Sequence, residues 1–438
     1  MPDIHDSRDA ATGFASQDGA AIFDSLAGAV PLPETARDGI FLLFHVHCLP
    51  SLLPMLQRLI AVGIPARNMV LVPKPYSTIP AALASIGQLG LHVTGDNVPL
   101  RPGQYDQCIA AALQCGVDSI LALIGAALPI GAVPRLVLVD DGGMLSDMWC
   151  RTLARLPRAP RVDVVSVQQT SSGLYPSRLR TSASLNKVNV ARSAAKQHFE
   201  SRVIADALYR KSAALLPQTA LEKVGIIGLG TIGRNLAQLF AQAGSDVVVF
   251  DRDAARMDGV AGRRAGSIGQ CLSAAQTVFG CTGRNAISAD TLPPGTPGPH
   301  LISCSSRDVE FLALLQRDAR HYSDAAPFSV LAHQDADGNA YTLHNWGFPL
   351  NFDRTAEWEP AAHIMLTRAL IYAAIVQALR MLVSGPSAIL PLCPTVQQHI
   401  VRRWLDQCGL DCAEFGVPPQ AMADESWWRT HSHGPQPH

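Results

Sequence analysis

The chain has 438 residues, 16% of them charged and 48% hydrophobic, with a formal net charge of −1. Its length exceeds one ordinary core, so we expect two domains, and its near-neutral charge gives no electrostatic reason to bind nucleic acid or an anionic membrane. The longest apolar run, Ser119 to Pro134, contains Gly and Pro and is shorter than the ~20 residues of a membrane helix. Neither a CxxC pair nor a signal peptide is visible. We therefore expect a cytoplasmic globular protein.

Short apolar runs alternate with helix-like runs between Gly39 and about Ala195. After a polar arm at residues 1–37, helices are predicted at 50–64, 79–90 and 105–115, and strands at 39–47, 68–75, 134–143 and 161–170. Strands that alternate with helices indicate a parallel sheet, and sites in such sheets lie beyond the carboxyl ends of the strands.

The strongest local signal is the sequence KVGIIGLGTIGRNLAQLFAQAGSDVVVFDRD. A strand at 224–227 leads into a GxGxxG turn and a helix that ends at Ala243, and a second strand at 247–250 ends at Asp251. In dinucleotide-binding folds these glycines allow a tight turn, close approach of a pyrophosphate and tight packing of helix on strand. We expect a Rossmann domain whose cofactor site contains Gly228, Gly230, Thr231, Ile232, Gly233 and Asp251.

The acid at the end of the second strand predicts which dinucleotide binds. Asp251 can accept hydrogen bonds from the adenosine ribose and would repel a 2′-phosphate, so NAD is the expected cofactor. Arg252 and Arg256 leave NADP open, because either could pair with such a phosphate. Later strands of the same sheet are predicted at 277–285 and 300–310.

The last part of the chain is predicted to be mainly helical. Residues 361–382 form the longest periodic helix, which could return to pack on the first domain, and 391–410 form another. From Ala413 onward, including Trp427 and Trp428, we expect a loosely ordered tail. The predicted α/β fold has two doubly wound parallel-sheet domains with a cleft between them: a substrate domain (38–195 with 352–412) and an NAD-binding Rossmann domain (196–351), flanked by an arm (1–37) and a C-terminal tail (413–438).

The order of several short motifs resembles S-adenosylhomocysteine hydrolase. The motifs VLVDDGG, QQTSSG, NVARSAAKQHFES, GxGxxG, GCTG, RDVE and GFPLNF occur in that order between about His45 and Leu379. The resemblance implies a substrate domain built from both ends of the chain, tight NAD binding and a homo-oligomer, dimer or tetramer. It also implies oxidation of a ribose hydroxyl of a nucleoside substrate, elimination, addition of water and re-reduction, a cycle of one-carbon metabolism.

The same resemblance implies roles for individual residues. Lys196 and its partner Glu200 would handle the proton of the oxidised hydroxyl, and Asp141 and His47 would serve later acid–base steps. It implies that Thr170, Ser171 and Ser172 bind the cofactor and that Thr282 and Asn351 contact its nicotinamide side. On the substrate side the expected residues are Gln169, Ser77 and Thr78.

Several positions depart from the family pattern. The carboxylate that grips the ribose hydroxyls is Gln169 here, and the two adenine readers near His47 are Leu49 and Ser51. The segment that closes over adenine is replaced by DRTAEWEP after Asn351. Losing several hydrogen-bonding readers together changes specificity, so we expect an altered substrate.

Other interpretations of these residues remain open. His45 and His47 share one face of a strand and could bind a metal, although no further His or Cys cluster accompanies them and no metal is predicted. Asp140 and Asp141 could cap the following helix. Lys196 and Glu200 have the i, i+4 spacing of an ordinary helix-surface pair.

Taken together, the residues predict an NAD-dependent, S-adenosylhomocysteine-hydrolase-like enzyme that oxidises a hydroxyl by hydride transfer to tightly bound NAD. Its expected partner is a small, nucleoside-like molecule, with no nucleic acid and no membrane. One alternative is a catalytically degenerate NAD-binding regulator or scaffold, and another is a genuine adenosylhomocysteinase.

Overall fold

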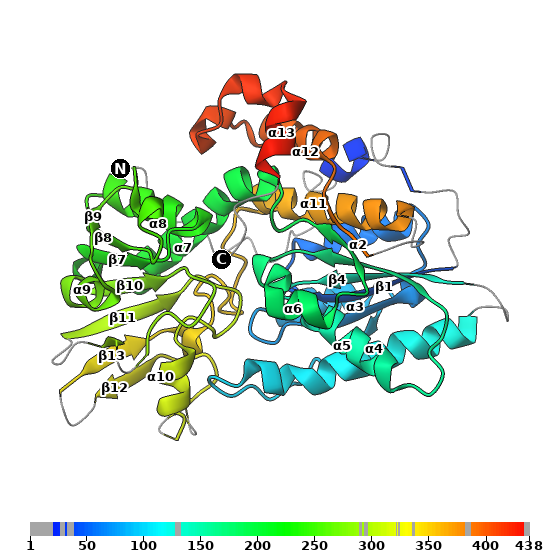
Figure 1. The fold of residues 1–438 in the computed structure, drawn as a ribbon, viewed down its shortest axis with the longest axis horizontal. Helices are drawn as coiled ribbons and strands as arrows, with labels where there is room; N and C mark the ends of the chain where they lie inside the picture. Colours follow the sequence, from blue (N-terminus) through cyan, green and yellow to red (C-terminus); the bar gives the residue numbers. More distant parts are fainter. Residues whose placement is uncertain are drawn as a thin grey trace.

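The computed structural model describes residues 21–26, 31–32, 39–127, 133–288, 291–292, 297–320, 322, 325–334, 338–381 and 387–432. The chain forms two α/β domains, each built around a seven-stranded sheet. In Figure 1 the sheet with the earlier strands lies on the right and the other on the left. The predicted fold class of two doubly wound parallel-sheet domains is confirmed.

The first sheet is parallel throughout, in the order β14-β6-β5-β4-β1-β2-β3. The order reverses at β1, which is the doubly wound pattern. Its strands are β1 (Ile40–Val46), β2 (Met69–Pro73), β3 (His92–Val93), β4 (Arg135–Asp140), β5 (Asp163–Gln168), β6 (Asn186–Asn189) and β14 (Ile389–Pro391).

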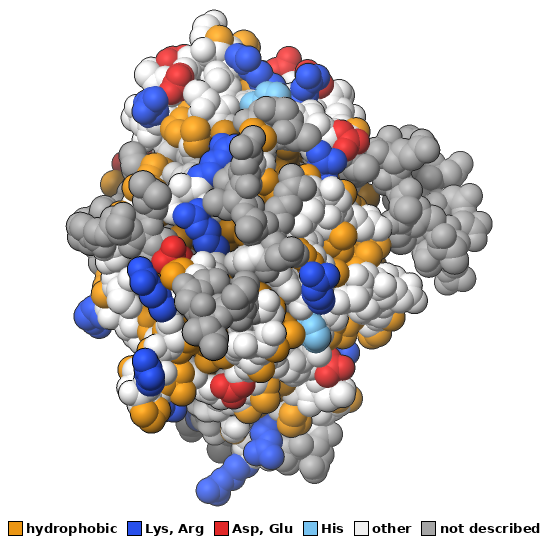
Figure 2. Space-filling view, turned by 90° about the vertical axis from the view of Figure 1, so that its right-hand side faces the viewer, with side chains coloured by type: hydrophobic (Ala, Val, Ile, Leu, Met, Phe, Trp, Pro, Cys, Tyr) orange, Lys and Arg blue, Asp and Glu red, His pale blue; other side chains and the backbone are white. Residues whose placement is uncertain are grey.

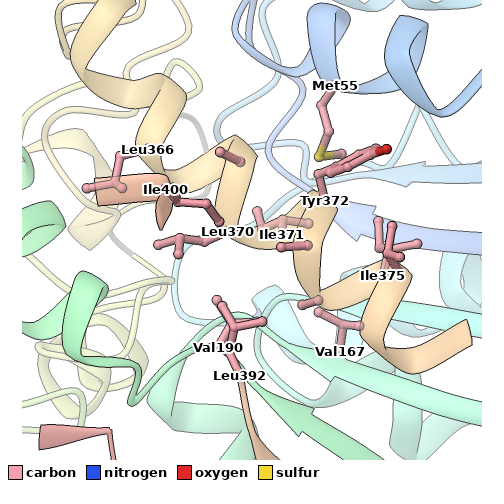
Figure 3. Close-up of a cluster of buried hydrophobic side chains, with 14 of the residues drawn as sticks. Met55, Val167, Val190, Leu366, Leu370, Ile371, Tyr372, Ile375, Leu392 and Ile400 are labelled. Atoms are coloured by element: carbon pink, nitrogen blue, oxygen red, sulfur yellow. The ribbon is translucent and has the colours of Figure 1, made fainter. Parts of the chain in front are cut away.

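Helices cover both faces of the first sheet, and one of them returns from the C-terminal part of the chain. Of the 20 residues of α11, 14 are buried, and it packs against α2 and against β4, β5 and β6. Figure 3 shows its Leu370, Ile371 and Ile375 among side chains from the first part of the chain. The α-helices of this domain are α2 (Leu52–Ala61), α3 (Pro80–Gly87), α4 (Tyr105–Ala127), α5 (Met144–Arg155), α6 (Pro176–Thr181), α11 (Ala361–Arg380) and α12 (Pro394–Cys408).

The second sheet has the order β12-β13-β11-β10-β7-β8-β9, parallel except for the antiparallel edge pair β12–β13. The order turns at β7, the strand that precedes the GxGxxG sequence, as in Rossmann folds. Its strands are β7 (Lys223–Ile227), β8 (Asp246–Phe250), β9 (Arg263–Arg264), β10 (Thr277–Gly280), β11 (Pro297–Ser303), β12 (Leu331–Gln334) and β13 (Ala340–Leu343), and its helices α7 (Ser201–Leu215), α8 (Thr231–Gln242), α9 (Ile268–Ala274) and α10 (Leu312–Arg317).

The loops beyond the carboxyl ends of the two sheets contact each other. The hydroxyl of Tyr175, in the loop after β5, lies 3.4 Å from the carbonyl oxygen of Gly283, which follows β10. Arg307, which follows β11, forms an ion pair with Asp106 of α4. Because ligands of doubly wound sheets bind beyond these strand ends, both domains present their binding edges to the same region.

The C-terminal tail was predicted to be loosely ordered, and for residues 413–432 that prediction is wrong. Two 3-10 turns (Cys412–Phe415 and Pro419–Met422) precede helix α13 (Glu425–His431). Trp428 is fully buried and its ring stacks on Phe199 with 6.1 Å between centroids. His431, predicted to be solvated, stacks on Trp427 at 4.3 Å. The last six residues, like most of the arm at 1–37, lie outside the described residues.

Two helices of the described chain, α4 and α11, are long and apolar enough to cross a membrane by length and composition alone. α4 runs through Gly125, so the apolar run after Ser119 is not broken at that glycine as the sequence suggested. The most apolar stretch of α11 is 78% buried inside the protein, as expected for a core helix. Figure 2 shows basic and acidic side chains interspersed over one face of the molecule, without a continuous patch of one sign in its described part.

Candidate functional site

Polar side chains follow the carboxyl ends of four neighbouring strands in the first sheet. His47 comes directly after β1, Lys74 after β2, Asp141 after β4 and Gln169 after β5. The strands are parallel and in register, with His45 opposite Asp140 and Asp140 opposite Gln168. These side chains therefore meet at one edge of the sheet.

Three of them form a buried ionic cluster. His47 Nε2 lies 2.9 Å from one carboxylate oxygen of Asp141, and Lys74 Nζ lies 3.0 Å from the other. The Lys74 and Asp141 side chains are only 1% and 3% exposed. On its other side, His47 Nδ1 lies 2.7 Å from the Ser77 hydroxyl. A charge buried this deeply persists only when it is paired, as Lys74 and Asp141 are.

The pKa shifts assign a charge to each member of the cluster. Burial by itself would raise the pKa of Asp141, but the Lys74 ammonium and His47 bring it well below its usual range. Burial lowers the pKa of Lys74, and Asp141 opposes that shift. Burial also lowers the pKa of His47 to about 4, against the opposing pull of Asp141. At neutral pH, therefore, Lys74 and Asp141 form an ion pair, and a neutral His47 donates from Nε2 to Asp141 and accepts at Nδ1 from Ser77.

The structure separates the two neighbouring acids that the sequence left ambiguous. Asp140 accepts hydrogen bonds from the backbone N–H groups of Gly143 and Ser146 at 3.0 and 2.8 Å and from the Ser146 hydroxyl at 2.6 Å, so it caps α5. Asp141 takes no part in this cap and turns to His47 instead.

The remaining residues of this edge support the cluster. The Thr78 hydroxyl donates to the Lys74 carbonyl oxygen at 2.8 Å. The Ser77 hydroxyl lies 3.2 Å from the same oxygen but gives its one proton to His47, so these two predicted substrate residues shape the loop that carries the lysine. His45 is fully buried and its Nδ1 lies 3.0 Å from the Val72 carbonyl oxygen. Within the described residues no group of three potential metal ligands occurs.

Lys196 and Glu200 lie on a single π-helical turn, Ala195–Glu200, that leads into α7. Lys196 Nζ is 3.0 Å from a Glu200 carboxylate oxygen and donates to the Gln169 carbonyl oxygen at 3.0 Å. The other Glu200 oxygen accepts from the Thr367 hydroxyl of α11. This is not an ordinary helix-surface pair, because the two side chains are only 13% and 9% exposed. π-helical turns of this kind are common at functional sites.

Gln169, predicted to contact substrate, is buried and links the Lys196–Glu200 pair to the end of β4, beside Asp141. Its backbone N–H donates to the Asp140 carbonyl oxygen at 3.1 Å, while its own carbonyl accepts from Lys196. Its side-chain Nε2 is buried with no hydrogen-bond partner in the described structure. A buried donor without a partner is costly, and a ligand acceptor would satisfy it.

The glycine turn of the second domain has the geometry of a pyrophosphate cradle. Gly228 has φ +93°, and a Cβ there would lie 2.7 Å from the Cys281 backbone. A Cβ on Gly233 would lie 2.0 Å from the Gly228 carbonyl oxygen. A Cβ on Gly230, by contrast, would meet no atom within 4 Å. Two glycines thus hold strand and helix together, and the third faces open space at the N-terminus of α8, where an anion binds favourably.

The acid predicted to bind the ribose lies beside this turn. One carboxylate oxygen of Asp251 accepts from the Leu229 N–H at 2.7 Å and the other from the Asp253 N–H at 2.9 Å. Asp251 is partly exposed and directly follows β8. Its remaining lone pairs are therefore available to ribose hydroxyls. Thr231 and Ile232 form the first turn of α8, as predicted from the motif.

The residues predicted on the nicotinamide side are hydrogen-bonded within the protein. The Thr282 hydroxyl donates to Glu310 at 2.8 Å, and the Gly283 N–H donates to the other Glu310 oxygen at 2.6 Å. Burial raises the pKa of Glu310 to about 7, although the Ser305 and Thr282 hydroxyls oppose it. This role of Glu310 was not predicted, although the residue is the last of the RDVE motif.

Thr170, Ser171 and Ser172 follow Gln169 at the end of β5. The hydroxyls of Thr170 and Ser172 lie 3.1 Å apart, and Ser171 is exposed. This short polar stretch lies between Gln169, which holds Lys196, and Tyr175, which contacts the loop after β10. It therefore runs along the junction of the two domains.

A second buried polar network follows Asn351, in the segment with the sequence DRTAEWEP. Asn351 donates to Glu359 at 2.7 Å, and burial together with Glu357 raises the pKa of Glu359 to about 7. Glu357 accepts from the Ser51 N–H at 3.0 Å and from its hydroxyl at 2.5 Å. Arg368 donates to the same hydroxyl at 2.9 Å. The segment therefore docks against the start of α2.

The aromatic residue next to Asn351 covers the histidine of the ionic cluster. The Phe352 ring stacks on His47 with 4.1 Å between centroids and 19° between planes. No role was predicted from the sequence for Lys74 or for the buried acids Glu357 and Glu359. The one visible signal for Lys74 was a charged residue at the end of an apolar strand.

Comparisons with known proteins identify the second domain. Residues 223–310 match the family described as the NAD binding domain of 6-phosphogluconate dehydrogenase. The open cradle at Gly230 and the acid after β8 fit that cofactor. The chain therefore carries an NAD-binding domain, and NAD is its cofactor.

Two relatives match a larger part of the chain, and their names give no activity. The uncharacterized proteins MT0113 and Rv0104 of Mycobacterium tuberculosis (strains CDC 1551 / Oshkosh and ATCC 25618 / H37Rv) are each 30% identical over 353 residues, covering 78% of this chain. The match spans 64% of the length of each of these relatives.

Two solved structures resemble the chain loosely. An NAD-complexed D-isomer specific 2-hydroxyacid dehydrogenase from Lactobacillus delbrueckii ssp. bulgaricus matches with TM-score 0.33 and 12% identity, over 78% of this chain and 96% of that one. An NAD-dependent formate dehydrogenase from Staphylococcus aureus in complex with NAD matches with TM-score 0.33 and 12% identity, over 56% and 77%. TM-scores this low do not by themselves establish a fold. The fold is assigned from the order and direction of the strands in the two sheets.

Proposed function

We propose that this protein is an NAD-dependent enzyme that oxidises a hydroxyl group of a small, nucleoside-like substrate, with chemistry similar to that of S-adenosylhomocysteine hydrolase and altered substrate recognition. The observation that carries the proposal is the position of the Lys196–Glu200 pair. It lies between the ionic cluster of the first domain and the dinucleotide turn of the second.

Short hydrogen-bonded links run in both directions from this pair. Lys196 donates to the Gln169 carbonyl oxygen, and Gln169 is bonded in turn to the backbone just before Asp141. On the other side, Ser201, directly after Glu200, accepts from Asn235 at 3.2 Å. Asn235 also donates at 2.9 Å to the carbonyl of Thr231, the first residue of α8. The lysine is thus fixed relative to the helix that begins at the pyrophosphate cradle.

The residues of the chain supply the groups that such a reaction needs. NAD bound at the cradle supplies the hydride acceptor. Lys196 would donate a hydrogen bond to the substrate hydroxyl, and Glu200, bonded to the same ammonium, would receive the released proton. His47 is neutral at pH 7 and would take up a second proton at Nδ1, which accepts a hydrogen bond from the Ser77 hydroxyl. Asp141 orients its ring, and Lys74 balances the charge of that acid.

The altered substrate recognition is inferred from two residues on the substrate side of the site, Gln169 and Ser51. Gln169 carries an amide where the resembling family has a carboxylate for the ribose hydroxyls. Ser51, at a position where that family reads adenine, is already bonded to Glu357. A substrate of this protein would therefore be recognised by different polar contacts from those of S-adenosylhomocysteine.

The test is an assay with the 438-residue protein and NAD. Purified protein is incubated with adenosine, S-adenosylhomocysteine and other nucleosides, while NADH absorbance and homocysteine release are followed separately. Lys196→Ala should lower the rate of cofactor reduction by about 10²–10⁴-fold while NAD binding is retained. Lys223→Ala, at an exposed position on β7, is the matched control and should behave like the wild type. Equal rates for Lys196→Ala and wild type would reject the assignment.

A second candidate function is an NAD-bound regulator or scaffold without turnover. It is favoured by the Phe352 ring that lies on His47 and by the docked segment that contains Glu357. NAD that co-purifies with the protein, together with no cofactor reduction by any hydroxyl compound tested, would support this candidate over the enzyme.

A further inference from the structure

A cavity of about 230 Å³ lies at the junction of the two domains, beside Ser172 and Tyr175 of the loop after β5. One wall comes from α5 and α6 and carries Arg151 and Arg178; the loop after β11 contributes Arg307. Liquid water occupies about 30 Å³ per molecule, so the cavity has room for an anionic group and a few further atoms. It is too small for a dinucleotide, whose phosphate cradle lies at the start of α8.

The three arginines around this cavity differ in how they are paired. Arg178 pairs with Asp147 at 2.5 Å and with Asp106 at 3.4 Å, and Arg307 pairs with the same Asp106. Among the described residues, Arg151 forms no ion pair or hydrogen bond, although its side chain lines the cavity. The three guanidinium groups are accompanied by three carboxylates, because Asp308 also interacts electrostatically with Arg307 and Asp147 also interacts with Arg151. The cavity therefore offers an arginine without an ion-pair partner rather than an excess of positive charge.

The donors of these arginines are not exhausted by their ion pairs. A guanidinium has five N–H groups, and the ion pair of Arg307 with Asp106 uses one nitrogen of three. Arg307 also adopts φ 121°, a strained conformation for a residue other than glycine. Ser172 adds a hydroxyl to the lining. The cavity therefore offers forked N–H donors from both domains, which suits the planar or tetrahedral oxygens of an anion.

We propose that this cavity is a binding site for the carboxylate or phosphate group of a small metabolite, held by Arg151 of the first domain and Arg307 of the second. A ligand that contacts both arginines bridges the two domains. Binding should therefore raise the midpoint of thermal unfolding, whether or not NAD or a turnover substrate is present. The proposal goes beyond the oxidoreductase function and does not depend on it.

The test uses the 438-residue protein without added nucleotide. Inorganic phosphate and succinate are titrated separately by calorimetry and by thermal unfolding, with sodium chloride at equal ionic strength as the reference. We expect one saturable site per chain for at least one anion; phosphate alone or succinate alone identifies the ligand class. Saturation by neither anion at concentrations up to about 10 mM would overturn the proposal, because a built site with two forked donors should bind more tightly than that.

Variants locate the site. Arg151→Gln should weaken binding about tenfold or more, and it should fold normally, because Arg151 is exposed and makes no ion pair within the described structure. Arg155→Gln, also exposed and one turn along the same helix, is the matched control and should bind as the wild type does. Asp147→Asn should bind either anion more tightly, because it removes a competing carboxylate. Unchanged binding by Arg151→Gln, an equal loss in Arg155→Gln, or weaker binding by Asp147→Asn would each contradict the assignment.

Discussion

Replacing Gly230 by alanine should separate NAD binding from folding. Its backbone is extended (φ −67°, ψ −170°), a conformation open to any residue, and an added Cβ would meet no atom within 4 Å. The stability of the NAD-free protein should therefore stay constant or rise by about 0.5 kcal/mol through the unfolded state. The same methyl group would occupy the space through which a pyrophosphate approaches the backbone.

The loss of affinity can be worked from the hydrogen bonds at risk. A backbone N–H bond to a charged phosphate contributes roughly 1.5–3 kcal/mol, so losing one should raise the Kd for NAD about 10- to 150-fold. Gly233→Ala should behave differently, because its Cβ would lie 2.0 Å from the Gly228 carbonyl oxygen. It should destabilise the NAD-free protein by about 1–3 kcal/mol, the usual cost of overpacking.

Isothermal titration with NAD and chemical denaturation of the NAD-free protein measure the two effects independently. Gly125→Ala, in α4 of the other domain and with no atom within 4 Å of its Cβ, is the control and should leave NAD affinity unchanged. Wild-type affinity in Gly230→Ala, or destabilisation of Gly230→Ala as severe as that of Gly233→Ala, would refute the role given to the turn.

Three further changes test the first domain. Lys74→Met leaves Asp141 buried without its cation and should cost about 3–5 kcal/mol of unfolding free energy by urea denaturation, most of it regained when Asp141→Asn is added. The pKa of His47 is about 4 in the folded protein against an ordinary 6.5, so its stabilising contribution is complete above pH 6.5 and is lost as the pH falls toward 4. Denaturation curves of His47→Gln should therefore vary less over that range, by up to about 3 kcal/mol. Trp428→Ala should cost about 3–5 kcal/mol by the same assay, because the ring is fully buried against Phe199, whereas Trp428→Phe should cost less.

The sequence predicted best those features whose physical cause is local. The glycine turn was identified from the sequence because each glycine has its own steric task within a few residues. Asp141 and His47 were predicted from the resemblance, and each follows a strand of a parallel sheet, where sites form. The strand β6 was missed because its sequence, NKVN, is mostly polar although every residue of it is buried.

Features that depend on distant partners could not be predicted in the same way. Lys74 acquires its role only when β1, β2 and β4 place His47, the lysine and Asp141 at one edge. The polar and aromatic composition of the C-terminal segment indicated a loose tail. In the structure, however, Trp428 packs against Phe199, more than two hundred residues earlier in the chain. Tertiary packing decided both cases.

A crystal structure of the 438-residue protein with NAD tests the central claim most directly. The account predicts the pyrophosphate against Gly230 and the nicotinamide facing Lys196, so that one substrate hydroxyl carbon could lie about 3–3.5 Å from the ring while its oxygen contacts Nζ. A nicotinamide directed into solvent, or separated from Lys196 and Glu200 by the protein core, would contradict it.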